Sequence, residues 1–529
     1  MGSRNRAATG AAAAVGLGLL ALAAPVHAGT TDLGAGMSLD WLANLTYSAA
    51  VRTDDADDRL LSDVNRDDGN RAFDKGSLIN NRLALLAEGT FRYQQYGLFA
   101  RGSAFYDDVY FRDSDNESQA TLNRGGSADR FSDRTRDRLG ARARMLDFYG
   151  FAALPIGDKL LDVRVGNQVV SWGESLFFPN TSGAQAPADA TKSNVPGTEV
   201  KDILLPLGQV SLQMGLTDRL SLMGYWQWQW NSTELNPSDA FFSSSDVVGP
   251  GAEFLLVPQL ADFGLSPEVP RGPDDKPDDG KDWGIGIRYR LGDATELSLY
   301  HLHYADKNPT GARINTTGPL PTSYNIVYID DIQMTTVALS SEVAGAAIGA
   351  ELSYRQDAGM NLLVGTSPTP GRGDALQGNL NATRLFLPTK YWDTLLVLGE
   401  LSYVRVIDTE AIVVPTAGGP VAFDDLAGKR STGAVQMLVQ AGYQQVWQGW
   451  DLTWSLVNGY GLEGTSAIAG ALGSFTGKGD IRYSFGPTFK YLGNLEIGLA
   501  YNGYAGGASL ARRTLADRSH AAFSVKYSF

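Results

Sequence analysis

Polar and apolar side chains alternate along many segments of this chain. In LSLMGYWQWQW (220–230), Trp226, Trp228 and Trp230 share one parity and the glutamines share the other. A repeat of two residues is the pattern of a β-strand, whose successive side chains point to opposite faces. Three tryptophans on one face predict that this face contacts lipid, and the glutamines predict a wet interior behind it.

The same alternation predicts an all-β chain of eighteen strands. The number falls to sixteen if 160–171 and 379–387, whose patterns are weak, are not strands. The eighteen segments lie near 38–52, 77–92, 95–111, 139–153, 160–171, 207–216, 219–233, 281–291, 294–306, 328–341, 346–356, 379–387, 393–407, 431–446, 450–461, 480–491, 494–506 and 519–529.

Short and long connections strictly alternate between these segments. Short turns such as YQQ, LTD and LGN are followed by connections of a dozen to nearly fifty residues. This arrangement is typical of a transmembrane antiparallel β-barrel with short periplasmic turns and long extracellular loops. Because lipid accepts no unpaired backbone groups, strands that cross a membrane must close into a barrel.

The N-terminal segment has the features of a secretory signal peptide. Arg4 and Arg6 precede the apolar run AAAAVGLGLLALAAP, and VHA follows as a cleavage site. We therefore expect residues 1–28 to be removed and 29–529 to form one barrel domain in the outer membrane of a Gram-negative bacterium.

The composition and the C-terminal pattern agree with this location. The chain has no cysteine, so it forms no disulfides. Its net charge of −14 disfavours nucleic-acid binding. The final segment, AFSVKYSF, places Phe523, Val525, Tyr527 and Phe529 on one face, and it resembles the C-terminal assembly signal of bacterial outer-membrane barrels.

Three stretches resemble the bacterial family called domain of unknown function 1302. They are DDGNRAFDKGSLINNR (67–82), GNQVVSWGESLFFPNT (166–181) and VPGTEVKDILLPLGQVSLQMGLTDRLSLMGYWQWQWNSTELNP (195–237). The stretches fall in the first half of the chain. The chain departs from the family at QAPADATKSN (185–194), where members commonly carry an NPVD-like segment.

The resemblance implies an outer-membrane barrel that moves lipid-like or other hydrophobic molecules. Family members are often encoded beside a periplasmic lipid-carrier-like protein and an inner-membrane exporter of the resistance-nodulation-division type. These two proteins and outer-membrane lipid are therefore the expected partners. The direction of transport stays open, as do two alternatives: a general porin for small polar solutes, and a structural or adhesive barrel.

An eighteen-stranded barrel has an interior wide enough for an aqueous channel unless a segment fills it. The connection 172–206 has the length and mixed polarity to fold inward and gate the passage, although an extracellular cap has the same features. Its candidate gate residues are Trp172, Glu174, Phe177 and Phe178. Glu174 and the charged residues Lys192, Glu199 and Lys201 are expected to pair with interior charges such as Arg142 and Arg164.

The longest predicted loop, 234–280, contains two apolar clusters. They are Phe241 with Phe242, and the stretch that includes Phe254 and Leu255. Apolar clusters in a polar loop predict either a hydrophobic binding patch or a small core that folds the loop.

Charged residues of the early strands are predicted to face the barrel interior. A row of arginines would attract an anionic headgroup or carboxylate. We favour the alternative that opposite charges pair across strands and hold a wide barrel in shape. The arginines are Arg82, Arg101, Arg142, Arg144 and Arg164, and the acidic residues are Glu88, Asp107 and Asp162.

The sequence carries only weak signals for metal binding and catalysis. Asp63, Asn65 and Asp67 alternate as in a calcium loop, but Asp68 stands where such loops need glycine. His301 and His303 share a strand face, and two ligands do not make a metal site. With no GxSxG motif and few histidines, we expect no cofactor and no enzymatic activity.

Overall fold

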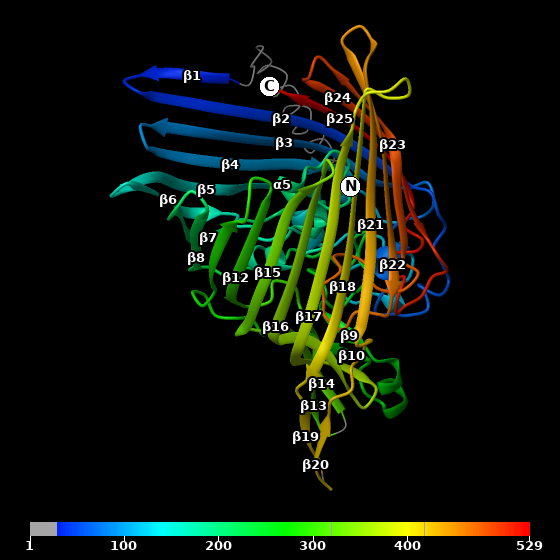
Figure 1. Ribbon diagram of the computed structural model, residues 1–529. Coiled ribbons are helices and arrows are strands. Elements are labelled where there is room, and N and C mark those ends of the chain that lie inside the picture. The colour runs from blue at the N-terminus through cyan, green and yellow to red at the C-terminus, as the bar shows by residue number, and fades with distance from the viewer. Residues whose placement is uncertain (1–28, 319, 417) are drawn as a thin grey trace.

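The computed structural model describes residues 29–318, 320–416 and 418–529, so the predicted signal peptide (1–28) lies outside the described residues. Eighteen strands close into one antiparallel barrel, which confirms the predicted number (Figure 1). They are β2 (Met37–Arg52), β3 (Leu78–Tyr93), β4 (Tyr96–Asp107), β5 (Ala141–Ile156), β6 (Lys159–Gln168), β7 (Leu207–Gly215), β8 (Leu220–Gln227), β11 (Trp283–Arg290), β12 (Thr295–Tyr304), β15 (Ile332–Val343), β16 (Ala346–Val364), β17 (Ser367–Phe386), β18 (Thr394–Thr409), β21 (Ser431–Trp447), β22 (Trp450–Glu463), β23 (Ile481–Tyr491), β24 (Leu495–Ala505) and β25 (His520–Ser528).

Each barrel strand pairs with its neighbours in chain order, and the first and last strands close the ring. In that closure Asn44 of β2 lies opposite Ser528 of β25, and Arg52 lies opposite His520. An additional strand, β1 (Gly29–Gly34), pairs with the part of β2 that extends beyond β25. Closure leaves no open sheet edge in the wall of the barrel, as lipid requires.

The long connections carry short elements of their own. Figure 1 shows the hairpins gathered at the end of the barrel away from the β1–β2 turn. The hairpins are β9 (Phe254–Leu256) with β10 (Glu268–Pro270), β13 (Gly311–Thr317) with β14 (Leu320–Val327), and β19 (Ile412–Thr416) with β20 (Gly419–Phe423). The α-helices are α2 (Asp68–Arg71), α3 (Asp133–Thr135), α4 (Thr181–Gln185) and α5 (Val200–Ile203).

None of the described helices has the length and apolar character needed to span a membrane.

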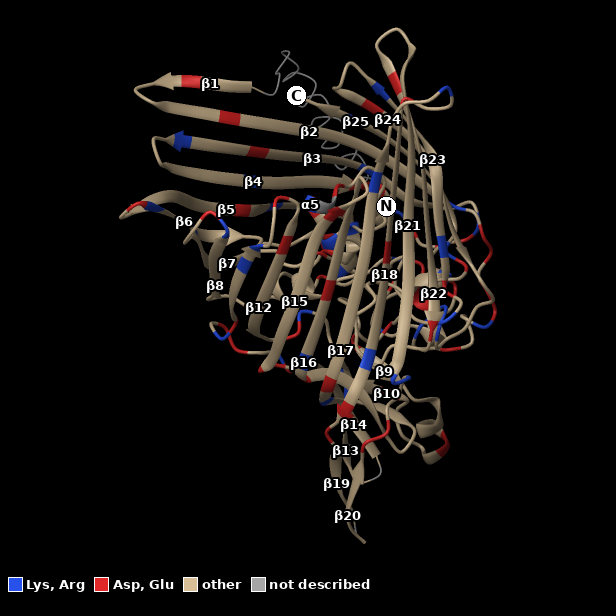
Figure 2. Cartoon of the chain, viewed as in Figure 1, with Lys and Arg blue, Asp and Glu red and all other residues tan. Residues whose placement is uncertain are grey.

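The two faces of the wall have different chemistry. In β8, Leu222 and Trp226 are exposed on the outside, whereas Met223, Tyr225 and Gln227 are buried on the inside. Figure 2 shows the same contrast at larger scale, with long uncharged stretches along the strands and charges concentrated at turns and loops. The outer face therefore suits lipid, while the inner face packs against protein.

The prediction for the tryptophan row is wrong at its end. Trp228 is exposed like Trp226, but β8 stops at Gln227 and the chain then turns away from the wall. Trp230 is buried, with its ring centroid 5.2 Å from that of Tyr328. A tryptophan beyond the strand end has no lipid to face, so it packs under the loops instead.

The connection predicted between β16 and β17 is also wrong. Most of residues 357–378 continue the two strands, which pair as far as Val364 and Ser367. The stretch is rich in proline and glycine, which are disfavoured inside strands. Met360 and Leu362 on the inner side of this extension are fully buried in an apolar cluster under neighbouring loops, and their burial stabilises the extended hairpin.

Candidate functional site

The connection between β6 and β7, residues 169–206, is called the inner loop here because it lies inside the barrel. It contains α4 and α5, and it contacts inward-facing side chains of strands on several sides of the wall. Two stretches of the loop are held in different ways, first by apolar packing and buried glutamates and then by ion pairs.

Trp172 anchors the start of the inner loop to the wall. Its ring stacks on Tyr300 of β12, with 5.4 Å between centroids, and meets Tyr225 of β8 edge-on at 5.0 Å. Gly284 and Gly286 of β11 make this packing feasible, because a Cβ there would lie 2.4 Å from the Tyr225 ring and 2.8 Å from the Tyr300 ring. The predicted candidate Trp172 is therefore a buried anchor.

Two buried glutamates bind the next stretch through its backbone. Glu351 of β16 accepts hydrogen bonds from the N–H groups of Glu174 (2.7 Å) and Thr181 (2.9 Å). Glu400 of β18 accepts hydrogen bonds from the N–H groups of residues 176, 177 and 178. A hydrogen bond to a charged group contributes about 1.5–3 kcal/mol, so together these bonds fix the stretch firmly.

Amide side chains on the inner face of β17 complete this attachment. Their N–H groups donate to backbone carbonyls of the inner loop, as Asn381 does to Glu174 (2.6 Å), Asn379 to Phe178 (3.0 Å) and Gln377 to Pro179 (3.0 Å). Sequence reasoning missed these amides and Glu400. The one available signal was the spacing of Gln377, Asn379 and Asn381 at alternate positions.

Gly173 allows the wall and the loop to approach closely. It has a φ of 93°, and a Cβ at this position would lie 2.3 Å from a carboxylate oxygen of Glu351. Any other residue would meet both backbone strain and a steric clash here.

Phe177 and Phe178, two of the candidate gate residues, pack against another loop of the protein. Phe178 is fully buried, with its ring centroid 5.9 Å from that of Phe475 in the β22–β23 loop. Phe177 packs against the same apolar cluster. Leu176 is the apolar side chain of this stretch that stays exposed. Both phenylalanine rings therefore contact protein side chains.

The later stretch of the inner loop is held by ion pairs. Glu199 pairs with Lys526 of β25 (2.9 Å), and Lys201 pairs with Glu88 of β3 (3.5 Å). Lys192 is buried, and burial together with the charge of Arg144 lowers its pKa to about 8. The predicted pairs of this loop with Arg142 and Arg164 are not among its contacts in the described residues.

Four of the five predicted interior arginines have carboxylate partners. Arg82 pairs with Asp107 and Arg101 with Asp147, in both cases across neighbouring strands. Glu234, at the start of the β8–β11 loop, is the partner of the other two. Arg138 also pairs with Glu234, so three arginines surround this carboxylate. Arg144 forms a second ion pair with Asp189 of the inner loop.

Burial alone would raise the pKa of Glu234, but the hydrogen bond from Arg142 and the surrounding positive charge hold it at about 2. The carboxylate is therefore ionised at neutral pH and ties the β8–β11 loop to β5.

Arg164 differs from the other predicted arginines. It has no carboxylate partner within the described ranges, and its guanidinium lies 5.8 Å from the centroid of the Tyr149 ring. It lines a cavity of about 730 Å³ between the β3–β4 turn and the start of the inner loop. The lining mixes charged, neutral polar and apolar side chains. It includes Arg92, Arg164, Arg288 and Asp162, the amides Gln94, Gln95 and Gln213, and the apolar side chains of Phe151, Trp172 and Met223.

The apolar clusters of the longest loop lie in different surroundings. Phe241 is fully buried beside Phe73, with 5.5 Å between ring centroids, and Phe242 packs against the same cluster. Phe254 and Leu255 lie in the short strand β9 and are partly buried. The first pair thus forms a small core under the loops and is not an open apolar patch.

The alternating residues of the first long connection are dispersed. Asp63 pairs with Arg66 (3.3 Å), and the amide of Asn65 donates to the carbonyl of Leu256 (2.9 Å). Asp67 instead lies beside Asp68 and Asp246.

Comparisons with known proteins agree with the sequence resemblance. The family described as "Protein of unknown function (DUF1302)" matches residues 9–529. A search of curated proteins finds no match.

Several solved structures of barrel proteins are similar over most of the chain. OccAB1 of Acinetobacter baumannii is 9% identical with a TM-score of 0.44, covering 95% of this chain and 99% of that one. A BenF-like porin from Pseudomonas fluorescens Pf-5 is 9% identical with a TM-score of 0.42, covering 93% and 98%. OccK11 of Pseudomonas aeruginosa is 10% identical with a TM-score of 0.40, covering 93% and 96%.

Proposed function

This chain belongs to the DUF1302 family, and we propose that it is an outer-membrane channel for amphiphilic molecules that carry an apolar chain and an anionic group. The inner loop gates the passage. The closed transmembrane barrel is observed, whereas the class of molecule that passes through it is proposed.

The cavity of about 730 Å³ supports this substrate class most directly. Arg164 supplies a positive charge without a carboxylate partner in the described residues, and Trp172 and Met223 supply apolar surface beside it. A cationic group next to apolar side chains suits a lipid-like molecule, because the headgroup and the chain bind different parts of the lining. A small sugar would use only the polar part.

Transport by the reconstituted protein tests the proposal. In liposomes, we expect faster entry of an alkyl sulfonate, which stays anionic, than of an uncharged alkyl glucoside of equal chain length. Arg164→Ala should remove most of this preference. Arg219→Ala, in the β7–β8 turn outside the cavity, is the matched control and should retain it. Equal entry of both probes through the wild-type protein contradicts the proposal.

The proposal includes the partners that the family resemblance implies: a periplasmic lipid-carrier-like protein and an inner-membrane exporter of the resistance-nodulation-division type. Envelope lipidomics of a deletion strain, combined with uptake of a labelled fatty acid, tests this arrangement and its direction. Altered envelope lipid with normal uptake supports export, and the reverse supports uptake. Unchanged lipid and uptake would contradict both directions and favour a structural or adhesive barrel.

A general porin for small polar solutes is the second candidate, and one observation favours it. A separate cavity of about 320 Å³ lies between the inner loop and β23–β25, and much of its lining is polar, including Asn194, Ser484, Glu496 and Lys526. A porin of this kind would show a large open conductance and size-limited sugar entry. The amphiphile channel should show a small conductance until the inner loop is displaced.

A further inference from the structure

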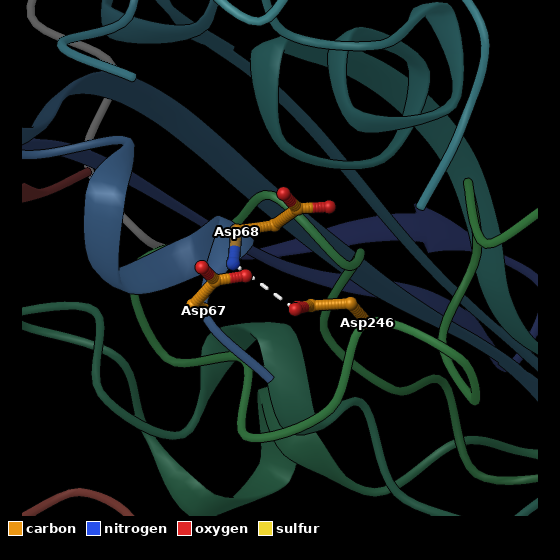
Figure 3. Close-up of side chains that lie close together, drawn as sticks. All are labelled: Asp67, Asp68 and Asp246. Carbon is orange, nitrogen blue, oxygen red and sulfur yellow. Dashed lines mark hydrogen bonds between the residues drawn. The ribbon is translucent and has the colours of Figure 1, made fainter. Parts of the chain in front are cut away.

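Three aspartates meet under the extracellular loops, apart from the proposed route. Asp67 and Asp68 lie at the start of α2, and Asp246 lies in the β8–β11 loop. One oxygen atom from each lies within 4.8 Å of the other two (Figure 3). All three side chains are fully buried. Since burying unpaired carboxylates is costly, the cluster requires a compensating positive charge or protons.

Each carboxylate uses one oxygen atom and leaves the other without a partner. Asp67 Oδ2 accepts from Arg71 (2.5 Å), Asp68 Oδ2 accepts from the N–H of Asn123 (3.3 Å), and Asp246 Oδ2 accepts from the N–H of Asp68 (3.0 Å). The three Oδ1 atoms have no hydrogen-bond donor among the described residues, although they are closed off from solvent. A fourth buried oxygen, Asn123 Oδ1, is in the same condition.

Arg71 is the one cation that pairs with the cluster in the described chain, and it neutralises Asp67 alone. Asp68 and Asp246 form no ion pair within the described ranges. The three bare carboxylate oxygens therefore point to a missing cation, because buried polar atoms are rarely left without a partner and here each carboxylate of one cluster leaves one bare.

We propose that the carboxylates of Asp67, Asp68 and Asp246 bind a calcium ion that ties the first long connection to the longest loop, β8–β11. Calcium prefers oxygen ligands at about 2.3–2.6 Å, so ligands on opposite sides of one ion lie up to about 5 Å apart. Magnesium requires shorter, nearly octahedral contacts and keeps several waters, which a fully buried, irregular set of carboxylates does not favour. Asn123 Oδ1 is a candidate for a fourth ligand.

Calcium binding by the full chain in detergent tests the proposal. After treatment with EDTA and dialysis, we expect calorimetry and elemental analysis to find one bound calcium ion per chain. Calcium should also slow trypsin cleavage in the β8–β11 loop. Asp246→Asn should weaken binding by about tenfold or more, because affinity follows the number of charged ligands. Asp262→Asn, an exposed residue of the same loop, is the matched control and should bind like the wild type.

Three results would overturn the assignment. Wild-type protein that binds no calcium at about 10 mM, above the affinity range of extracellular calcium modules, has no such site. Unchanged affinity in Asp246→Asn places the ion elsewhere. If magnesium binds as tightly as calcium, the assignment of the site to calcium is wrong. The wild-type titration decides the matter even if a variant does not assemble.

Discussion

The earlier and later stretches of the inner loop lie in the same barrel but are attached by different physics. Residues 172–185 bury Trp172, Phe178 and Ala184 and direct backbone N–H groups at Glu351 and Glu400. Residues 192–202 rely on ion pairs with Lys526 and Glu88, whose side chains are partly exposed. Buried hydrogen bonds to a charged group are strong and little affected by salt, whereas partly exposed ion pairs contribute little stability and are screened by salt.

This difference indicates which part of the loop moves. The earlier stretch acts as a fixed wedge, since releasing it would expose apolar side chains and leave two buried carboxylates without donors. The later stretch can leave its contacts at a smaller free-energy cost. It borders both the polar cavity near β23–β25 and the inner face of β3. For the proposed channel, we therefore expect the later stretch to move and the earlier stretch to occlude the passage.

Deleting residues 176–198 tests both stretches at once and should have the largest effect. The variant loses part of the wedge and the start of the movable stretch, so single-channel conductance should rise severalfold, with greater antibiotic sensitivity. A heat-modifiability gel checks that the barrel still assembles. Deleting 413–422, the projecting β19–β20 hairpin, is the control and should leave the conductance unchanged. An assembled variant with unchanged conductance would place the obstruction in the β8–β11 loop.

Removing one carboxylate of the wedge should have the next largest effect. Glu400→Ala leaves three backbone N–H groups of residues 176–178 without an acceptor, and each buried, unsatisfied group costs about 1–3 kcal/mol. The chain has no cysteine, so Ala184→Cys can report release of the wedge by thiol labelling. We expect labelling to accelerate at least about tenfold, which corresponds to about 1.4 kcal/mol.

The isosteric variant Glu400→Gln sharpens this test because it keeps an acceptor oxygen but removes the charge. It should label at a rate between those of the wild type and Glu400→Ala. Equal labelling of all three proteins would mean that apolar packing alone holds the wedge.

The sequence predicted the barrel well because lipid imposes a strict rule on it. Alternating faces and sorted loop lengths identified all eighteen strands, and the end of β21 was placed within one residue. The same pattern could not predict β1 or the long β16–β17 hairpin, since both lie partly outside the lipid-facing region where alternation is enforced. The prediction that Trp230 faces lipid was wrong for the same reason, because Trp230 lies beyond the end of β8.

The interior was predictable only in part. Composition identified the inner loop as a candidate, and its position inside the barrel is consistent with that hypothesis. Its partners, however, are residues about two hundred positions away, such as Glu400, and single-sequence patterns carry no information about such contacts. Arg142 shows the same limit, because its partner Glu234 comes from a loop and not from a neighbouring strand.

The buried lysine of the later stretch predicts a smaller, pH-dependent effect. Lys192 faces Arg82, Arg144, Asp189 and Asp202, and its pKa of about 8 lies below its ordinary value. The undocked loop therefore binds more protons than the docked loop between pH 8 and the ordinary lysine pKa, and docking strengthens as pH rises through this window. Labelling of Val195→Cys should slow between pH 7.5 and 9.5 after correction for thiol reactivity, and Lys192→Met should remove this pH dependence.

Salt should produce the smallest effect and should separate the two stretches most cleanly. The Glu199–Lys526 pair is partly exposed, so its contribution is about 0.2–1 kcal/mol, and 1 M salt shortens the screening length to about 3 Å. Glu199→Gln should speed labelling of Val195→Cys by about two- to fivefold at low salt and have no effect at high salt. Glu342→Gln, near the end of β15, is the control. Because Ala184→Cys reports on the wedge, its labelling should not respond to salt; a similar response at both positions would show that the inner loop moves as one unit.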